Sequence, residues 1–342
     1  MSQRGDLVGA RETSPLVSAW DRPLVDPNIE DARIAHRLAP LAGVPVLGRV
    51  EAAYRQKLRL KSWQYMTAVT DELFIAFVVG TAGFASNGFV YAAELATGKV
   101  YKKFAITPLT VGTHVAPSST SGTHRFHTRG LTVGIDNSGR AFTARVAAKT
   151  DGGGQLDADL AFASYTNDEH LSICVPLPGN RWNYTHKFAA FAVTGHVTLD
   201  GKRIPFDKGR SFGTMDFTKM FALRHAVWKW IALCGRTKAG HVLGMNLVDP
   251  TPDAPISENA VWVDGKRHAL ARVEIEDSAA RADGAMIAMR DVAEVTQKLD
   301  LPLVRHRLRH VVGSFSGRVT AGGATHEIEN VVGIYEDYDT WW

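Results

Sequence analysis

The stretch "FTKMFALRHAVWKWIALCGR", residues 217–236, contains two tryptophans, Trp228 and Trp230, separated by one lysine. Strand alternation would place both indoles on the same face. A buried indole needs a partner for its N–H, and Arg224 and Asn246 lie nearby in the sequence. The pattern predicts the wall of an apolar cavity that carries a few polar groups. The alternative is core packing in which both indoles are hydrogen-bonded.

Polar residues also lie beside other apolar, strand-like runs. They are Tyr184 and Lys187 in "NYTHKF", Asp216 in "TMDF", Glu258 and Asn259 in "SENAVWV", and Glu336 in "GIYEDYDTWW". A carboxyl group in an apolar pocket has a raised pKa, which suits a general acid. We therefore take Asp216 and Lys187 as candidate catalytic residues. The candidate ligand-binding residues are Tyr184, Asn259 and Glu336, together with Trp228, Trp230, Arg224 and Asn246. For each residue alone, the alternative is capping, turn bonding or solvent exposure.

Short motifs for other chemistries lack the context that they need. The "GRSFG" segment around Ser211 matches a nucleophile-elbow pattern, but "GKRIPFDK" precedes it where a buried strand is required. Paired histidines occur in "HRFH" (124–127) and "HRLRH" (306–310), whereas zinc needs three or four ligands and no C-x-x-C or H-E-x-x-H accompanies them. No phosphate-binding loop is present. We expect no metal and no cofactor.

The composition is that of an ordinary soluble globular protein. The 342 residues include 39 basic and 35 acidic side chains, without the basic stripe of a nucleic-acid binder. Two cysteines fit a reducing cytoplasm. The N-terminus has no signal-peptide core, and the longest apolar run, 72–86, is shorter than the ~20 residues of a membrane span. We expect a cytoplasmic protein with no integral membrane segment and no nucleic-acid partner.

From about Val50 onward, turn residues separate short alternating segments, as is typical of β-hairpins. In 197–206 and 261–270 an Asp-Gly pair separates two alternating halves, which is a strong signal for a type I′ turn. Alternation in "VRHRLRHVV" (304–312) predicts a strand with its arginines on the solvated face. In 284–299 apolar residues recur at helical spacing, so we leave that segment open between helix and strand. Short β segments of this kind suggest barrels or sandwiches.

The stretch from "SFGTMDF" to "ENAVWVDG", together with "KLRLKSWQYMTA" and "GIYEDYDTWW", resembles the largely bacterial family catalogued as domain of unknown function 2804. On that resemblance Asp216, Trp228 and Trp230 match family positions, although "FTKM" (217–220) stands where the family has a glycine. Four further residues fall on its other polar positions: Lys187, Asn246, Asn259 and Glu336. The family has no assigned activity. A more remote similarity to carotenoid hydratases implies two lipocalin-like barrels, apolar ligands and acid-assisted addition of water to an alkene.

We therefore predict a mainly β protein with two antiparallel lipocalin-like barrels, or curved sheets, side by side. Residues 1–48, rich in proline and charge, should form an irregular N-terminal arm. The first β-barrel domain should span residues 49–192 and the second 193–342, with the boundary near 188–196. The arm should pack on the first barrel or across the junction.

The leading functional hypothesis is binding of an apolar or amphipathic small molecule in a barrel cavity, with Trp228 and Trp230 as its wall. The alternative is an enzyme, a hydratase, isomerase or cyclase, acting on a lipid or isoprenoid-like substrate. Asp216 would protonate the alkene, and the indoles would stabilise the carbocation. A third hypothesis is a structural or partner-binding protein. The sequence leaves the ligand and the oligomeric state open.

Overall fold

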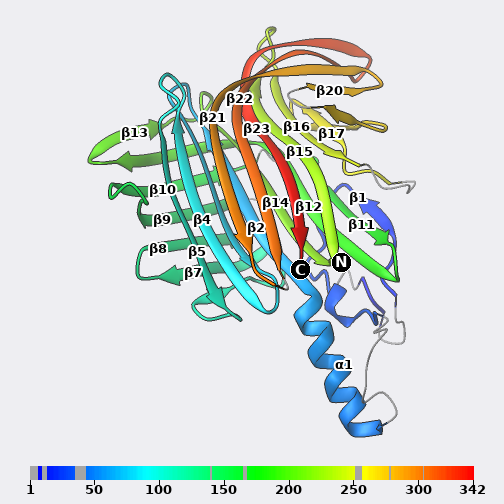
Figure 1. The fold of residues 1–342 in the computed structure, drawn as a ribbon. Helices are drawn as coiled ribbons and strands as arrows, with labels where there is room; N and C mark the ends of the chain where they lie inside the picture. Colours follow the sequence, from blue (N-terminus) through cyan, green and yellow to red (C-terminus); the bar gives the residue numbers. More distant parts are fainter. Residues whose placement is uncertain are drawn as a thin grey trace.

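In a computed structural model the chain is almost entirely β-structure. The structure describes residues 7–9, 14–34, 44–138, 141–164, 168–250, 256–276, 279–302 and 304–342. Two curled antiparallel sheets each form a half-barrel, which confirms the predicted fold class (Figure 1). No helix in the described part of the chain is long and apolar enough to cross a membrane.

The first sheet has fourteen strands among the described residues. They are β1 (Ser18–Trp20), β2 (Leu60–Val69), β3 (Leu73–Thr81), β4 (Ala85–Glu94), β5 (Val100–Pro108), β6 (Thr113–His114), β7 (Ser121–Thr128), β8 (Leu131–Ser138), β9 (Ala141–Lys149), β10 (Gln155–Ala163), β11 (Leu171–Leu177), β12 (Arg181–Leu199), β13 (Lys202–Phe206) and β14 (Phe212–Phe221). Its main path runs β5-β4-β3-β2-β14-β12-β10-β9-β8-β7-β6. The middle of this path therefore joins strands that lie far apart in the sequence.

The second sheet has nine strands among the described residues, in the order β18-β17-β16-β15-β23-β22-β21-β20-β19. They are β15 (His225–Arg236), β16 (Val242–Asp249), β17 (Ala260–Val263), β18 (Lys266–Ala269), β19 (Glu274–Glu276), β20 (Ala279–Ala282), β21 (Ala285–Asp300), β22 (Arg305–Ala321) and β23 (Ala324–Trp341). The chain passes from the first sheet to the second between β14 and β15. The expected boundary at residues 188–196 lies inside β12, so the division into domains at 193 stays a prediction.

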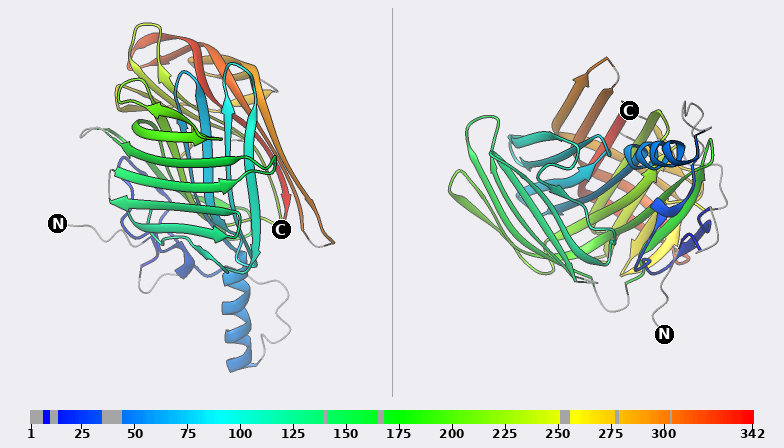
Figure 2. Two further views of the ribbon diagram at one scale, coloured as in Figure 1. Left: turned by 90° about the vertical axis from the view of Figure 1, so that its left-hand side faces the viewer. Right: turned by 90° about the horizontal axis from the view of Figure 1, so that it is seen from below.

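The first sheet curls so far that β7–β10 lie across the strands at its other end (Figure 2). At the contact the ring of Phe126 on β7 packs onto Gly88 of β4, where an added Cβ would come within 2.3 Å of the ring. A large apolar core fills the space enclosed by this curl. A separate core fills the second half-barrel. A third joins the facing surfaces of the two sheets, with residues such as Tyr65 and Phe89 from the first and Trp230 and Tyr338 from the second.

Both predicted Asp-Gly hairpins are present. Asp200 and Gly201 join β12 to β13 with φ of 49° and 85°, and Asp264 and Gly265 join β17 to β18 with φ of 47° and 81°. Positive φ at both central residues is what a type I′ turn requires. These turns fix the register of the strands that they join.

The segment left open between helix and strand is the strand β21. A bulge between Asp291 and Ala293 shifts its register. Before the bulge Ile287 packs into the core of the second half-barrel, and after it Val295 packs between the sheets. The buried residues of the strand still follow a period of two, and the helix-like spacing arose because Met286, which is exposed, and Val292, at the bulge, were counted with them.

The N-terminal segment packs against the first sheet. Strand β1 pairs with β11, and residues that include Ile29, at the start of the 3-10 helix η1 (Ile29–Asp31), join the first core. Helix α1 (Pro45–Arg59) begins inside the last residues of the expected arm and extends away from the sheets (Figures 1 and 2). Proline is favoured at the first position of a helix, so Pro45 starts this helix where the sequence analysis expected a break.

Candidate functional site

A cavity of about 770 Å³ lies between the facing surfaces of the two sheets. The sequence placed it inside a barrel, whereas both half-barrels are filled by their own cores and the cavity opens where they face each other. We call it the intersheet cavity. Its wall comes from both sheets, with Lys187, Asp216, Tyr65, Val78 and Phe89 from the first and Trp228, Trp230, Leu308, Glu336 and Tyr338 from the second.

Strand pairing sets these side chains in rows. In the first sheet Lys187 pairs with Asp216, Asp216 with Tyr65, Tyr65 with Val78, and Val78 with Phe89. Directly paired residues point to the same face of an antiparallel sheet. All five therefore reach the cavity from five neighbouring strands.

The second sheet supplies matching rows. Trp230 pairs with Glu336, and Glu336 with His310. One step along, Trp228 pairs with Tyr338, and the two rings stack at 3.7 Å between centroids. The cavity is thus a gap between two rows of aromatic and ionisable side chains.

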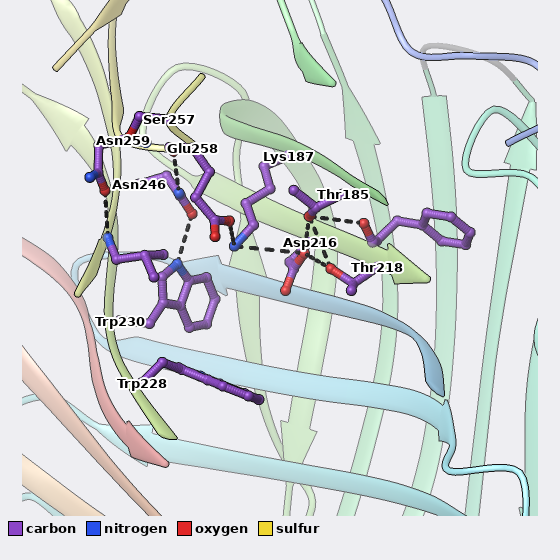
Figure 3. A network of polar contacts seen from close by, with 12 residues as sticks. Thr185, Lys187, Asp216, Thr218, Trp228, Trp230, Asn246, Ser257, Glu258 and Asn259 are labelled. Atoms are coloured by element: carbon purple, nitrogen blue, oxygen red, sulfur yellow. Dashed lines mark hydrogen bonds and ion pairs between the residues drawn. The ribbon is translucent and has the colours of Figure 1, made fainter. Parts of the chain in front are cut away.

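A buried lysine and two carboxylates form one polar group in this wall, which we call the Lys187 cluster (Figure 3). Lys187 Nζ lies 2.9 Å from Glu258 Oε2 and 3.9 Å from Asp216 Oδ1. Burial lowers the pKa of Lys187, but the charges of Asp216 and Glu258 raise it by more, and the pKa lies above its ordinary value. The cluster thus balances a buried cation with one acidic group from β14 and one from the segment just before β17.

Asp216 is held by three further donors. Trp63 Nε1 donates to Oδ2 at 3.0 Å, while the hydroxyls of Thr185 and Thr218 donate to Oδ1 at 3.1 and 2.9 Å. Both oxygens therefore act as acceptors. This arrangement suits a fixed anion better than the proton donor that the sequence suggested, and the catalytic role of Asp216 stays a prediction.

Trp230 is fixed beside the Lys187 cluster. Its Nε1 donates to Asn246 Oδ1 at 2.7 Å, and Asn246 Nδ2 donates to the backbone carbonyl of Glu258 at 2.8 Å (Figure 3). Lys187 Nζ lies 5.1 Å from the centroid of the indole ring, within cation–π distance. Asn246 thus orients the indole that faces the ammonium.

A second polar group, the Glu336 pair, lies on the opposite wall. Trp228 Nε1 donates to Glu336 Oε1 at 2.6 Å, and His310 Nε2 contacts Glu336 Oε2. The other nitrogen of His310 lies 3.0 Å from the Tyr91 hydroxyl. Burial alone would raise the pKa of Glu336, but His310, the Trp228 bond and the Lys187 charge hold that pKa below its ordinary value. The site therefore contains an ionised carboxylate with little exposure to water.

The structure brings five of the predicted site residues together at the cavity: Lys187, Asp216, Trp228, Trp230 and Glu336. Asn246 and Asn259 lie behind the wall, where they bond Trp230 and the Val248 backbone. Arg224 is exposed beside the cavity and does not line it. Tyr184 points to the other face of β12, where its hydroxyl bonds Ser172.

Four residues that complete the site had no role predicted from the sequence. They are Lys61, Trp63, Glu258 and His310. The sequence did contain a signal for His310, because strand alternation places it on the same face as Leu308. Lys61 and Trp63 alternate with Tyr65 on β2, but nothing local shows that this strand lies next to β14. Among the described residues, no group of three or more metal-ligating side chains is present.

Comparison with known proteins gives a family and a fold. The model of the family "Domain of unknown function (DUF2804)" matches residues 44–342. No curated protein matches the sequence. The crystal structure of CghA with Sch210972 is similar, with a TM-score of 0.55, 13% identity, and coverage of 81% of this chain and 87% of that one. Kievitone hydratase from Nectria haematococca has a TM-score of 0.46 and 11% identity, over 95% of this chain and 98% of that one.

Proposed function

We propose that this chain, which belongs to the family "Domain of unknown function (DUF2804)", binds an apolar or amphipathic small molecule in the intersheet cavity. The observation that carries the proposal is the cavity itself, about 770 Å³ between two rows of aromatic side chains. Ligand pockets of this size are mostly apolar with a few well-placed polar groups. The Lys187 cluster and the Glu336 pair supply those groups here.

The wall is built to hold a ligand in a fixed position. Trp228 is bonded to Glu336 and stacked on Tyr338, and Trp230 is bonded to Asn246. Fixed aromatic walls lose little conformational freedom on binding. Within the same fold, CghA has been crystallised with Sch210972, which supports the view that such a scaffold can hold a ligand of its own.

Native mass spectrometry of the protein purified from its own host tests the proposal. We expect a bound mass that is released on denaturation. Ala226→Trp, which fills the cavity wall, should remove that mass, whereas Ala161→Trp, at an exposed position of β10, should keep it. The proposal is wrong if Ala226→Trp carries the same bound compound in the same amount as the parent protein.

The Glu336 pair favours a second candidate function, an enzyme for a lipid or isoprenoid-like substrate. A carboxylate bonded to a histidine at the wall of an apolar cavity can transfer a proton to or from a substrate carbon. These groups suit an isomerase, hydratase or cyclase. Asp216, placed first in this role by the sequence, is the alternative proton-transfer group.

Proton exchange into the bound compound tests the enzymatic candidate. The compound released by denaturation is incubated with the protein in D₂O and followed by mass spectrometry. Turnover predicts deuterium uptake that Glu336→Gln abolishes, and a loss with Asp216→Asn would assign that residue as well. The enzymatic candidate is excluded for this compound if its mass and structure stay unchanged with the parent protein.

A further inference from the structure

A second buried lysine, Lys61, lines the intersheet cavity at a distance along the sheet from Lys187. It is the second residue of β2, directly after helix α1, and only 3% of it is exposed. Its Nζ donates to the backbone carbonyls of Leu58 at 3.0 Å and Ala82 at 2.5 Å. An ammonium has three donors, so these bonds leave one N–H for another acceptor.

The surroundings of Lys61 contain no neutralising charge. Within the described part of the chain, no carboxylate lies within ion-pair distance of its Nζ. Burial and then the charges of Arg59, Arg181 and Arg224 lower its pKa to about 7. The three arginines and the unpaired lysine thus favour an anion in this part of the cavity, whereas the Lys187 cluster contains its own counter-charges.

A second unsatisfied donor lies beside Lys61. The indole ring of Trp342 is 4.9 Å from Lys61 Nζ, and its buried Nε1 has no hydrogen-bond partner among the described residues. Buried N–H groups are normally paired because an unpaired one loses its bond to water without replacement. A cation and an N–H donor thus lack an acceptor at the same place.

Lys219 provides a comparison, because it is a buried lysine that lies away from the cavity. It lies on β14, which pairs with β2, and points to the opposite face of the sheet. It is equally buried and also bonds two backbone carbonyls, those of Pro27 and Pro117. Its Nζ, however, lies 2.5 Å from the carboxylate of Glu30. The missing partner of Lys61 is therefore specific to the cavity side.

We propose that Lys61 and the Trp342 N–H form a subsite for the carboxylate of an amphipathic acid whose apolar part occupies the intersheet cavity. An aromatic path leads inward from this subsite. The Trp342 ring lies 6.3 Å from that of Tyr338, which stacks on Trp228. The proposal rests on the proposed function and adds to it the class of ligand, an acid with an apolar body.

Binding of two matched probes, decanoate and 1-decanol, tests this subsite in the full-length protein by isothermal titration at pH 7. The unmodified protein should bind decanoate about tenfold or more tighter, because a bond to a charged partner is worth more than a neutral one. Lys61→Met should reduce that ratio to about one, because it removes the cation that the carboxylate meets. Trp342→Phe should lower only decanoate binding, by a smaller factor.

Lys219→Met is the matched control, because it removes an equally buried lysine from the other face of the same two strands. It should preserve the preference for decanoate, and circular dichroism checks the folding of each variant. Equal affinity of the parent protein for the two probes would overturn the carboxylate subsite while keeping the proposed function. Binding of neither probe would count against both proposals.

Discussion

The intersheet cavity contains two buried lysines whose electrostatic surroundings differ. Lys187 is surrounded by its own counter-charges, Glu258 at 2.9 Å and Asp216 at 3.9 Å. Within the part of the chain that the structure describes, Lys61 Nζ contacts two carbonyl oxygens and two aromatic rings and pairs with no carboxylate. Burying a charge is unfavourable unless the charge is paired. The charge of Lys187 is therefore neutralised within the protein, whereas under our proposal the charge of Lys61 is paired by a bound ligand.

The largest expected effect is the difference in stability between removing each lysine. Lys187→Met leaves two carboxylates buried without their cation and should lower the free energy of unfolding by about 3–5 kcal/mol. Lys61→Met removes a charge that has no partner and should change it by less than about 1 kcal/mol. Urea unfolding at pH 7 measures both.

Equal destabilisation by the two substitutions would contradict the comparison, because it would mean that Lys61 contributes as much to the fold as Lys187. Lys219→Met provides an internal reference, since Lys219 is as buried as Lys61 but paired with Glu30. We expect it to behave like Lys187→Met, although by a smaller amount because Glu30 is partly exposed.

The sequence predicted which residues share one face of a strand better than it predicted which strands lie next to each other. Alternation placed Trp228 and Trp230 together, and the Asp-Gly turns fixed the hairpins at 200–201 and 264–265. These signals are local, because side chains repeat every two residues in a strand and an I′ turn has its own residue preferences.

The pairings that assemble the site are not local. Asp216 meets Lys187 and Tyr65 only because β14 lies between β12 and β2. Proximity in sequence was also misleading, since Arg224 is close to Trp228 along the chain yet lies outside the cavity. In the sequence Lys61 is one of several basic residues in "KLRLKSWQYMTA". Its significance depends on what is missing around it in space, which no sequence pattern records.

A pH titration of stability gives the next largest effect. The pKa of Lys61 is about 7 in the folded protein and has an ordinary value of 10.5. Between these values the unfolded chain binds more protons, so this group makes stability rise with pH, by at most about 1.4 kcal/mol per unit. The charged groups that act on Lys61 are Arg59, Arg181 and Arg224.

Subtracting the Lys61→Met profile from that of the parent protein isolates this contribution. From pH 7 to 9 the difference should grow by about 2 kcal/mol in favour of the parent protein. Below pH 7 both the folded and the unfolded lysine are charged, and the difference should stay constant. If the difference in stability between the two proteins does not change with pH, Lys61 titrates as an ordinary lysine. Its surroundings would then not differ from those of Lys187 in the way argued above.

The smallest effect compares one indole from each end. Trp228→Phe and Trp342→Phe remove the same N–H and a similar part of the ring. Trp228 donates to the ionised Glu336, so its loss should cost about 1.5–3 kcal/mol beyond the change in packing. The Trp342 N–H has no partner, so its removal should cost nothing beyond packing. Urea unfolding of the ligand-free protein should therefore rank Trp228→Phe as the less stable variant. With decanoate bound, the difference in the free energy of unfolding between the two variants should become smaller. The Trp342 N–H would then donate to the carboxylate, and Trp342→Phe would remove that bond. A gap that decanoate leaves unchanged would place the carboxylate away from Trp342.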